Sequence, residues 1–165
     1  MSPIAVLIGP PAAGKSRLGK RVATGLGVEF VDTDKMVVAS HGPIPEIFNT
    51  VGEAQFRQWE RDAVVTALST SGIVSLGGGA VLNEDTQRDL EKLRVVLITA
   101  TPDAIEPRLV AGNRPLLTGG IDAWKELVVA RQPIYERLAS ITVDTSRGTM
   151  DNIADELASR LGESS

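Results

Sequence analysis

The chain has 165 residues, 42% of them hydrophobic, and this composition suits one globular domain with a substantial core. Its apolar runs are far shorter than a membrane span and no basic, apolar leader opens the chain, so we expect neither a membrane segment nor a signal peptide. Cysteine is absent, which excludes disulfides and cysteine metal sites and is compatible with a cytoplasmic location. A net charge of −4 argues against a general nucleic-acid-binding surface, so a small anionic substrate would be held by a few placed arginines.

A stretch near the N-terminus matches the phosphate-binding pattern G-x-x-x-x-G-K-[ST]. The apolar run 4–8 before it predicts a buried strand. The spacing of Leu18, Val22 and Leu26 after it predicts a helix. The motif therefore lies in the strand–loop–helix context that phosphate binding requires. It reads Gly9-Pro10-Pro11-Ala12-Ala13-Gly14-Lys15-Ser16.

Each part of this loop has a physical role. Gly9 and Gly14 allow a tight turn around an anion, and the loop N–H groups and the helix N-terminus then favour a phosphate. Lys15 can reach the outer phosphates, and the Ser16 hydroxyl is suited to ligate Mg²⁺ between the β- and γ-phosphates. The alternative is a glycine-rich turn that binds nothing.

The rest of the chain alternates between predicted strands and helices. In the first half of the chain we expect a helix over 17–26, a strand over 28–31, a short helical turn over 44–50, a helix over 53–68 and a strand over 73–76. A helix over 83–93, capped by Asn83, a strand over 94–98, a helix opened by Thr101-Pro102 and a mobile loop over 111–120 follow. The chain then continues with a helix over 121–138 that is interrupted at Pro133, a strand over 141–144 and a helix over 150–161. This alternation predicts one α/β domain over residues 1–165, with about five parallel strands covered by helices on both faces.

Two aspartates follow the second predicted strand. If the strand geometry continues, Asp32 and Asp34 point to the same side, close to the bound phosphates. One carboxylate could then hold Mg²⁺ through its water shell while the other accepts a proton from a substrate hydroxyl. The alternative is a solvated turn in which an aspartate caps the next helix.

Three consecutive glycines, Gly77, Gly78 and Gly79, end the third predicted strand. Because they carry no side chain, a ligand or another backbone segment can approach closely, and their N–H groups can hold an oxygen-rich ligand. The alternative is a flexible loop.

Three arginines are candidates for binding anions. Arg57 and Arg131 lie on predicted helices, where an arginine taken alone is more often a surface residue. Arg114 lies in the glycine-rich loop, a place that suits closure over a triphosphate.

Taken together, these residues resemble the shikimate kinase family over nearly the whole chain. The phosphate-binding loop alone indicates only a nucleotide. The ordered set of later motifs is much more specific, because related small-molecule kinases lack most of them. The set comprises Asp32-Thr33-Asp34, Gly52-Glu53-x-x-Phe56-Arg57-x-x-Glu60, Ser75-Leu76-Gly77-Gly78-Gly79-Ala80, Arg114-Pro115-Leu116-Leu117 and Arg131-x-Pro133-x-Tyr135.

The resemblance implies transfer of the ATP γ-phosphate to the 3-hydroxyl of shikimate, in chorismate and aromatic amino-acid biosynthesis. It implies a P-loop, nucleoside-monophosphate-kinase-like fold with a core, a substrate-binding region near 33–60 and a lid near 111–121, and we expect a monomer. The residues that it assigns to ATP are Ala12, Ala13, Gly14, Lys15, Ser16, Arg17 and Arg114. Those that it assigns to shikimate are Asp34, Arg57, Gly77, Gly78, Gly79 and Arg131.

Within these assignments, the resemblance makes Asp34 the base and gives the substrate carboxylate to Arg57 and Arg131. Lys15 and Arg114 would neutralise the phosphates. The metal residues would be Ser16, as the ligand of Mg²⁺, and Asp32, in its outer shell.

The chain departs from the family in a few places. The family usually has glycine where Ala12 stands, and serine or threonine where Arg17 stands. Alanine at position 12 is tolerable only if that residue does not need a positive φ. A second basic residue that often contacts adenine before the lid is expected to be missing, with Leu109 near its place.

Two other functions are compatible with parts of this pattern. Another small-molecule kinase of the same fold, for gluconate or a nucleoside monophosphate, would share the loop, but a monophosphate kinase needs further arginines that this chain hardly offers. A catalytically idle nucleotide-binding regulator would also share it. The aspartate at position 34 and the arginine pair argue against the regulator.

Overall fold

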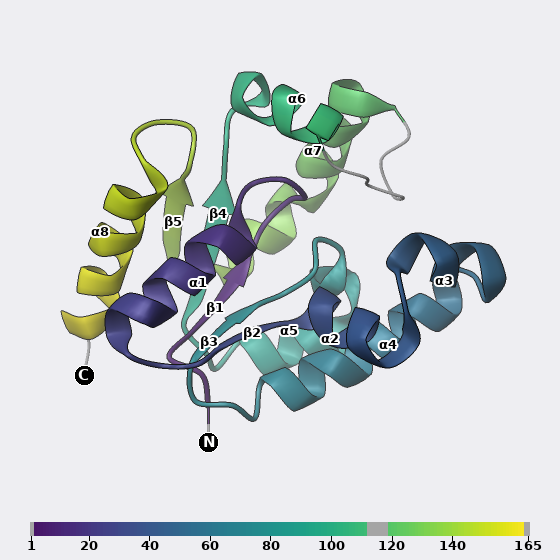
Figure 1. Ribbon diagram of the computed structural model, residues 1–165, viewed down its shortest axis with the longest axis horizontal. Helices are drawn as coiled ribbons and strands as arrows, with labels where there is room; N and C mark the ends of the chain where they lie inside the picture. Colours follow the sequence, from purple (N-terminus) through teal and green to yellow (C-terminus); the bar gives the residue numbers. More distant parts are fainter. Residues whose placement is uncertain (1, 112–118, 164–165) are drawn as a thin grey trace.

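A parallel β-sheet forms the centre of the molecule. The computed structural model describes residues 2–111 and 119–163. All strand pairs are parallel, and the strand order is β2-β3-β1-β4-β5 (Figure 1). The prediction of an α/β fold with a five-stranded parallel sheet is confirmed. The strands are β1 (Ala5–Ile8), β2 (Phe30–Asp32), β3 (Ile73–Ser75), β4 (Val95–Thr99) and β5 (Ile141–Asp144).

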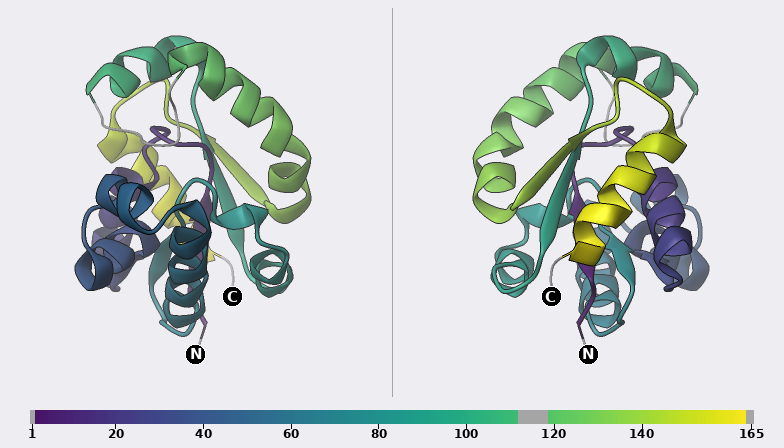
Figure 2. Two further views of the ribbon diagram at one scale, coloured as in Figure 1. Left: turned by 90° about the vertical axis from the view of Figure 1, so that its right-hand side faces the viewer. Right: turned by 90° about the vertical axis from the view of Figure 1, so that its left-hand side faces the viewer.

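Helices cover both faces of this sheet. α8 lies on one side of it and α7 on the other (Figure 2). The helices on the α8 side are α1 (Lys15–Leu26) and α8 (Met150–Glu163). Those on the opposite side are α4 (Glu53–Ala67), α5 (Glu84–Leu90) and α7 (Gly120–Leu138). The remaining helical segments are α2 (Thr33–His41), α3 (Ile44–Thr50), the 3₁₀ turn η1 (Ala80–Leu82) and α6 (Pro102–Ala111).

The strand sequences explain these two layers. Side chains alternate along a strand, so Ala5 and Leu7 of β1 pack against α1 and α8, whereas Val6 and Ile8 pack against α4, α5 and α7. Every residue of β1 is buried, as expected for the centre of a parallel sheet with helices on both faces. None of the described helices is long and apolar enough to cross a membrane.

The course of the chain places a functional edge at the end of β1. From β1 the chain crosses to β2 and returns to β3, which pairs with β1 on one side, and then continues to β4 on the other side. The strand order therefore reverses its direction at β1, and ligands of open α/β sheets bind at the carboxyl ends of the strands at such a point. The phosphate-binding loop leaves β1 at this place.

The second strand does not continue through Asp34, so the condition under which both aspartates would point to the same side is not met, and the alternative of an aspartate that caps the next helix holds for Asp32. β2 ends at Asp32, and α2 begins at Thr33. The Asp32 carboxylate accepts a hydrogen bond from the Lys35 backbone N–H at 3.2 Å, which caps the new helix.

Two prolines also lie inside helices. α6 runs through Pro107, and α7 continues through Pro133 to Leu138, so the interruption expected at Pro133 does not end the helix. Most of the predicted lid, including Arg114, lies outside the described residues.

Candidate active site

The phosphate-binding loop connects β1 to α1, as its sequence predicts. Gly9 and Gly14 have φ values of 148° and 99°, which glycine adopts without steric cost. The Lys15 ammonium lies inside the loop, where it donates hydrogen bonds to the carbonyls of Gly9 at 2.8 Å and Pro10 at 2.9 Å. The loop backbone therefore already surrounds the positively charged ammonium group of Lys15.

Ala12 does not meet the condition under which alanine would fit this position without strain. Its φ is 67°, and no other non-glycine residue in the described part of the chain has a positive value. The loop needs a left-handed residue at this point whatever side chain stands there, and for alanine that conformation costs about 1–2 kcal/mol. The neighbouring Ala13 directs its side chain into the core and contributes only its backbone to the loop.

A serine and an aspartate bring their oxygens together beside the loop. Ser16 donates a short hydrogen bond from its Oγ to Oδ2 of Asp32, and both residues line the same cavity. A hydroxyl and a carboxylate fit Mg²⁺, which prefers oxygen ligands and is often bound by one or two protein groups together with substrate phosphates. In the described chain no cluster of three or more His, Cys, Asp or Glu side chains could hold a metal by itself.

Asp34 faces the same cavity from the first turn of α2. The helix, not a continued strand, brings it there. Its carboxylate packs against Gly77 at the end of β3, where a Cβ would lie only 3.0 Å from the Asp34 Cγ. A carboxylate thus lies opposite the phosphate-binding loop, although the two aspartates reach the cavity from different secondary structures.

Two arginines enter the cavity from the α4–α7 side. Arg57 on α4 donates from Nη1 to Glu60 Oε1 at 2.9 Å and lies 5.4 Å above the Phe56 ring. Arg131 on α7 is only 8% exposed and donates from Nη1 to the Gly78 carbonyl at 2.6 Å. Planar guanidinium groups held in this way suit recognition of a carboxylate.

Burial changes the acidity of two groups behind these arginines. Desolvation raises the pKa of Glu60, and the charge of Arg57 offsets part of the rise. Burial also raises the pKa of Tyr135, against a smaller opposing effect of Arg131. The Tyr135 hydroxyl has no hydrogen-bond partner among the described residues. The groups behind the arginines are therefore shielded from water, which strengthens electrostatic interactions there.

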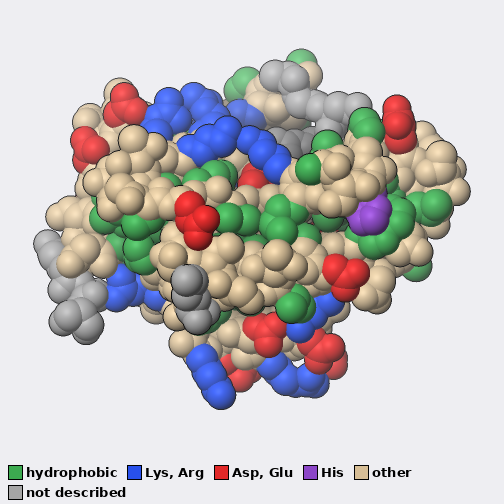
Figure 3. Space-filling model, turned by 60° about the horizontal axis from the view of Figure 1, so that its bottom comes forward, with side chains coloured by type: hydrophobic (Ala, Val, Ile, Leu, Met, Phe, Trp, Pro, Cys, Tyr) green, Lys and Arg blue, Asp and Glu red, His purple; other side chains and the backbone are tan. Residues whose placement is uncertain are grey.

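All these groups surround one cavity of about 710 Å³. The phosphate-binding loop with Arg17 forms one part of its wall, and Arg57, Arg131 and the last two glycines of the triplet form another part. Gly77 lies behind Asp34 and is not part of the cavity wall. Lys and Arg side chains gather beside a hollow on the face shown in Figure 3. Residues from the predicted substrate region 33–60 supply part of the apolar wall: Val38, Pro43, Ile44, Pro45 and Phe56.

Sequence reasoning missed two side chains that hold the loop in place. Arg108, one residue before Leu109, lines the cavity and donates to the carbonyls of Ala12 at 3.1 Å and Thr145 at 3.2 Å. A basic side chain therefore lies one position before Leu109, and its hydrogen bonds go to Ala12 and Thr145. Trp124 on α7 donates from Nε1 to the Pro11 carbonyl at 2.9 Å. The contacts of Arg108 with Ala12 and of Trp124 with Pro11 join residues 96 and 113 positions apart, so no local pattern could indicate them.

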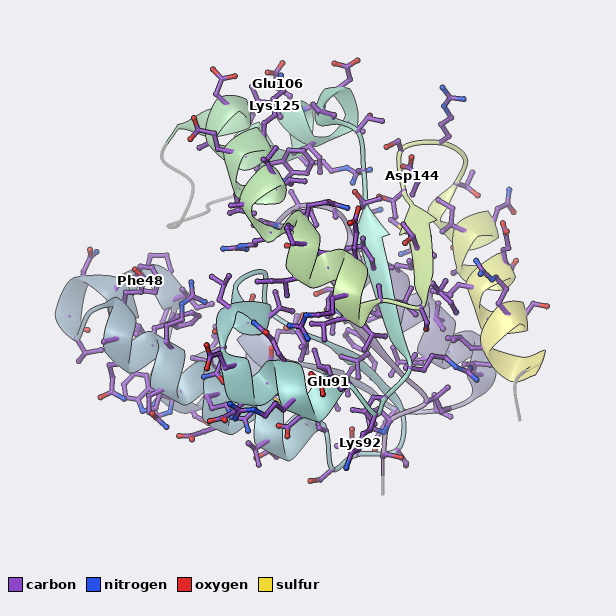
Figure 4. The ribbon with its side chains drawn as sticks, turned by 180° about the vertical axis from the view of Figure 1, so that it is seen from behind. Phe48, Glu91, Lys92, Glu106, Lys125 and Asp144 are labelled. Atoms are coloured by element: carbon purple, nitrogen blue, oxygen red, sulfur yellow. The ribbon has the colours of Figure 1, made fainter. Side chains whose placement is uncertain are left out.

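α7 is the element that spans both ends of the site. Figure 4 shows Lys125 close to α6 at one end of this helix, and Glu91, which pairs with Arg137 at 3.3 Å, near its other end. Between these ends the helix carries Trp124 to the phosphate-binding loop and Arg131 to the glycine triplet.

The fold and this cavity define a P-loop phosphotransferase that acts on a small anionic acceptor. The sequence profile of the shikimate kinase family matches residues 11–162. A shikimate kinase from Salinispora tropica is 45% identical and covers 98% of this chain and 99% of its own length. One from Rhodococcus erythropolis is 43% identical, with 98% of both chains covered. The chain belongs to the shikimate kinase family, and it is an ATP-binding kinase of aromatic amino-acid biosynthesis.

Solved structures agree with this membership. The shikimate kinase from Acinetobacter baumannii, solved in complex with shikimate, superposes with a TM-score of 0.89 at 28% identity, covering 98% of this chain and 93% of its own. A gluconokinase from Sinorhizobium meliloti shares the fold, with a TM-score of 0.60 at 16% identity over 96% and 90% of the two chains.

Proposed function

We propose that this enzyme transfers the γ-phosphate of ATP to the 3-hydroxyl of shikimate, giving shikimate 3-phosphate and ADP. The observation that carries the proposal is the placement of Asp34, Arg57 and Arg131 in the same cavity as the phosphate-binding loop. The related A. baumannii enzyme, which is solved with shikimate, supports the identity of the acceptor.

At the acceptor end, Arg57 and Arg131 bind the shikimate carboxylate. Each guanidinium is already oriented by an acceptor of its own, Glu60 for Arg57 and the Gly78 carbonyl for Arg131. Asp34 orients the reacting hydroxyl and takes its proton as the bond to phosphorus forms. The backbone of the glycine triplet holds the other hydroxyls.

At the nucleotide end, the loop 12–17 binds the phosphates. Lys15 turns from the loop carbonyls to the β- and γ-phosphates, and Arg114, which lies outside the described residues, would add a further positive charge. Ser16, as a ligand, and Asp32, in the outer shell, would hold Mg²⁺, which would neutralise part of the phosphate charge. Lid closure excludes water as a competing acceptor. The lid, the single-domain organisation, the monomeric state and the cytoplasmic location stay predictions.

ADP release with MgATP and a panel of acceptors tests this function. We expect release with shikimate and none above background with gluconate, AMP or CMP. Asp34→Asn should lower kcat by roughly 100-fold or more, in the range of general-base effects, while MgATP still binds. Turnover of gluconate or a nucleotide in place of shikimate would overturn the proposed acceptor. Undiminished turnover by Asp34→Asn would remove this residue as the base.

A further inference from the structure

The glycine triplet at the end of β3 does not need glycine for its backbone conformation. Seven described glycines have a positive φ, and Gly77, Gly78 and Gly79 are not among them. Gly79, for example, has φ −100° and ψ 1°, which other residues adopt readily. The three glycines are therefore explained by the lack of room for a side chain, and not by the backbone conformation.

Each glycine of the triplet packs against a different group of the site. A Cβ at Gly77 would lie 3.0 Å from Cγ and 3.2 Å from Oδ2 of Asp34. One at Gly79 would lie 2.7 Å from Nη2 and 2.9 Å from Cζ of Arg57. One at Gly78 would meet the ring of Pro11 in the phosphate-binding loop at 3.2 Å and 3.3 Å. A side chain at each of these three neighbouring positions would thus meet a different group: the proposed base, an arginine that binds the acceptor, or the phosphate-binding loop.

The triplet itself is fixed from both sides. The fully buried Thr33 accepts a hydrogen bond from the Gly77 N–H at its Oγ1, at 3.0 Å. Arg131 donates to the Gly78 carbonyl at 2.6 Å. Because the backbone is held, an added methyl group must displace its neighbour. At Gly77 and Gly79 those neighbours are the ends of side chains, which move without breaking the core.

We infer that the triplet positions the site: the space left by the absent side chain of each glycine determines where a different functional group lies. Gly77 determines the position of the Asp34 carboxylate, and Gly78 determines that of the phosphate-binding loop. Gly79 determines the position of the Arg57 guanidinium. This inference rests on the proposed roles of Asp34 and Arg57. Its consequence is that three adjacent alanine substitutions should alter three different kinetic parameters.

Steady-state kinetics of Gly77→Ala, Gly78→Ala and Gly79→Ala with shikimate and MgATP test the inference. Gly77→Ala should lower kcat by roughly 100-fold, the order expected for a base moved by about 1 Å, with both KM values nearly unchanged. Gly79→Ala should raise KM for shikimate by roughly 10-fold, as for a weakened charged hydrogen bond, and leave KM for MgATP unchanged. Gly78→Ala should raise KM for MgATP, which neither of the other two substitutions changes, because its Cβ would meet Pro11 of the phosphate-binding loop.

Gly25→Ala is the matched control, because Gly25 lies in α1 with its nearest outside atom 3.8 Å from a built Cβ. It should leave all three parameters at wild-type values. Circular dichroism and the melting temperature confirm folding of each variant. If one of the triplet variants does not fold, Thr33→Val, which removes the acceptor of the Gly77 N–H, should reproduce the loss of kcat, and Thr33→Ser should restore it.

The same defect in all three variants, or wild-type kinetics in all three, would overturn the inference. Identical kinetics of Thr33→Val and Thr33→Ser would also contradict it. A wild-type enzyme without activity on shikimate would instead refute the proposed function, so the two failures are distinguishable.

Discussion

At the scale of single residues, Ala12 has a backbone conformation that favours glycine, with φ 67°. We predict that Ala12→Gly raises the free energy of unfolding by about 0.5–1 kcal/mol, because it removes the left-handed strain of alanine and loses part of that gain to the greater freedom of glycine in the unfolded chain. For a chain of this length, the melting temperature should rise by about 2–4 °C per kcal/mol. Urea and thermal unfolding measure both quantities.

The neighbouring Ala13 provides the control for this substitution. Its side chain is fully buried and its φ is not positive, so Ala13→Gly removes a core methyl group without relieving strain and should lower stability. A destabilised Ala12→Gly would mean that the loop gains nothing from glycine at position 12.

Glu60 adds a dependence on pH. Burial raises the pKa of Glu60 above its ordinary value of 4.5. Its contribution to stability is therefore fully present below pH 4.5 and is lost as the pH rises through the folded-state pKa. Glutamine does not titrate. We therefore predict that Glu60→Gln removes the part of the decline in the free energy of unfolding with rising pH that Glu60 causes. The measurement is the free energy of unfolding in urea, at steps from pH 4.5 upward, for both proteins.

Glu53→Gln is the matched control, since Glu53 contacts the same arginine from an exposed position, at 3.4 Å. Its curve of stability against pH should follow the wild type. If the Glu60→Gln curve also runs parallel to the wild type, the pKa of Glu60 does not differ between the folded and unfolded states.

The sequence identifies the residues with local signals and misses those whose role depends on distant neighbours. Lys15 and Ser16 belong to a contiguous motif, so their places at the loop are predictable. The left-handed φ of Ala12 depends on how the whole loop is closed. Arg108 becomes part of the site only because α6 returns to the loop almost 100 residues later.

At the scale of elements, the strands were predictable because each is a short apolar run between turn residues. α2 was not predicted, because its hydrophobic residues have little helical periodicity. In addition, its capping residue Asp32 was interpreted as a residue of the binding site. The consequence for the site is that Asp34 is oriented by a helix and not by the sheet.

α7 fixes the phosphate-binding loop through Trp124, which is 2% exposed. We predict that Trp124→Phe keeps most of the packing but leaves the Pro11 carbonyl without its donor, at a cost of about 1–3 kcal/mol in stability. KM for MgATP should rise more than KM for shikimate, because the lost bond holds the nucleotide loop. Thermal unfolding and steady-state kinetics measure these effects.

Trp59→Phe is the corresponding control. Trp59 stacks on His41 at 3.6 Å between ring centroids, on the α2–α4 side of the molecule. An effect on KM for MgATP as large as that of Trp124→Phe would show that the loop is not held specifically by α7.

At the scale of the whole molecule, ligand binding should appear as added stability. A nucleotide at 100 times its Kd stabilises the folded state by about 2.7 kcal/mol, which corresponds to roughly 5–11 °C for a chain of this size. We predict a larger shift of the melting temperature with ADP and Mg²⁺ than with ADP and EDTA. Asp32→Asn should reduce this difference, because Asp32 contacts the Ser16 hydroxyl.

Asp85→Asn is the control, because it removes the same charge as Asp32→Asn but at an exposed residue, which pairs with Arg88 on α5. Asp85→Asn should retain the full effect of Mg²⁺. Equal shifts with and without the metal in the wild type would contradict the assignment of Ser16 and Asp32.

The continuity of the 710 Å³ cavity has a consequence for inhibition. No described element divides the nucleotide end from the acceptor end, so one covalent molecule that joins a cyclic hydroxy acid to a nucleoside through a phosphate bridge can occupy both. Such a bisubstrate compound loses its translational and rotational freedom once, whereas two separate ligands lose it twice. Its affinity should therefore exceed that of either half. Because it would use the arginine pair as well as the phosphate-binding loop, it should also discriminate against kinases that share only the loop.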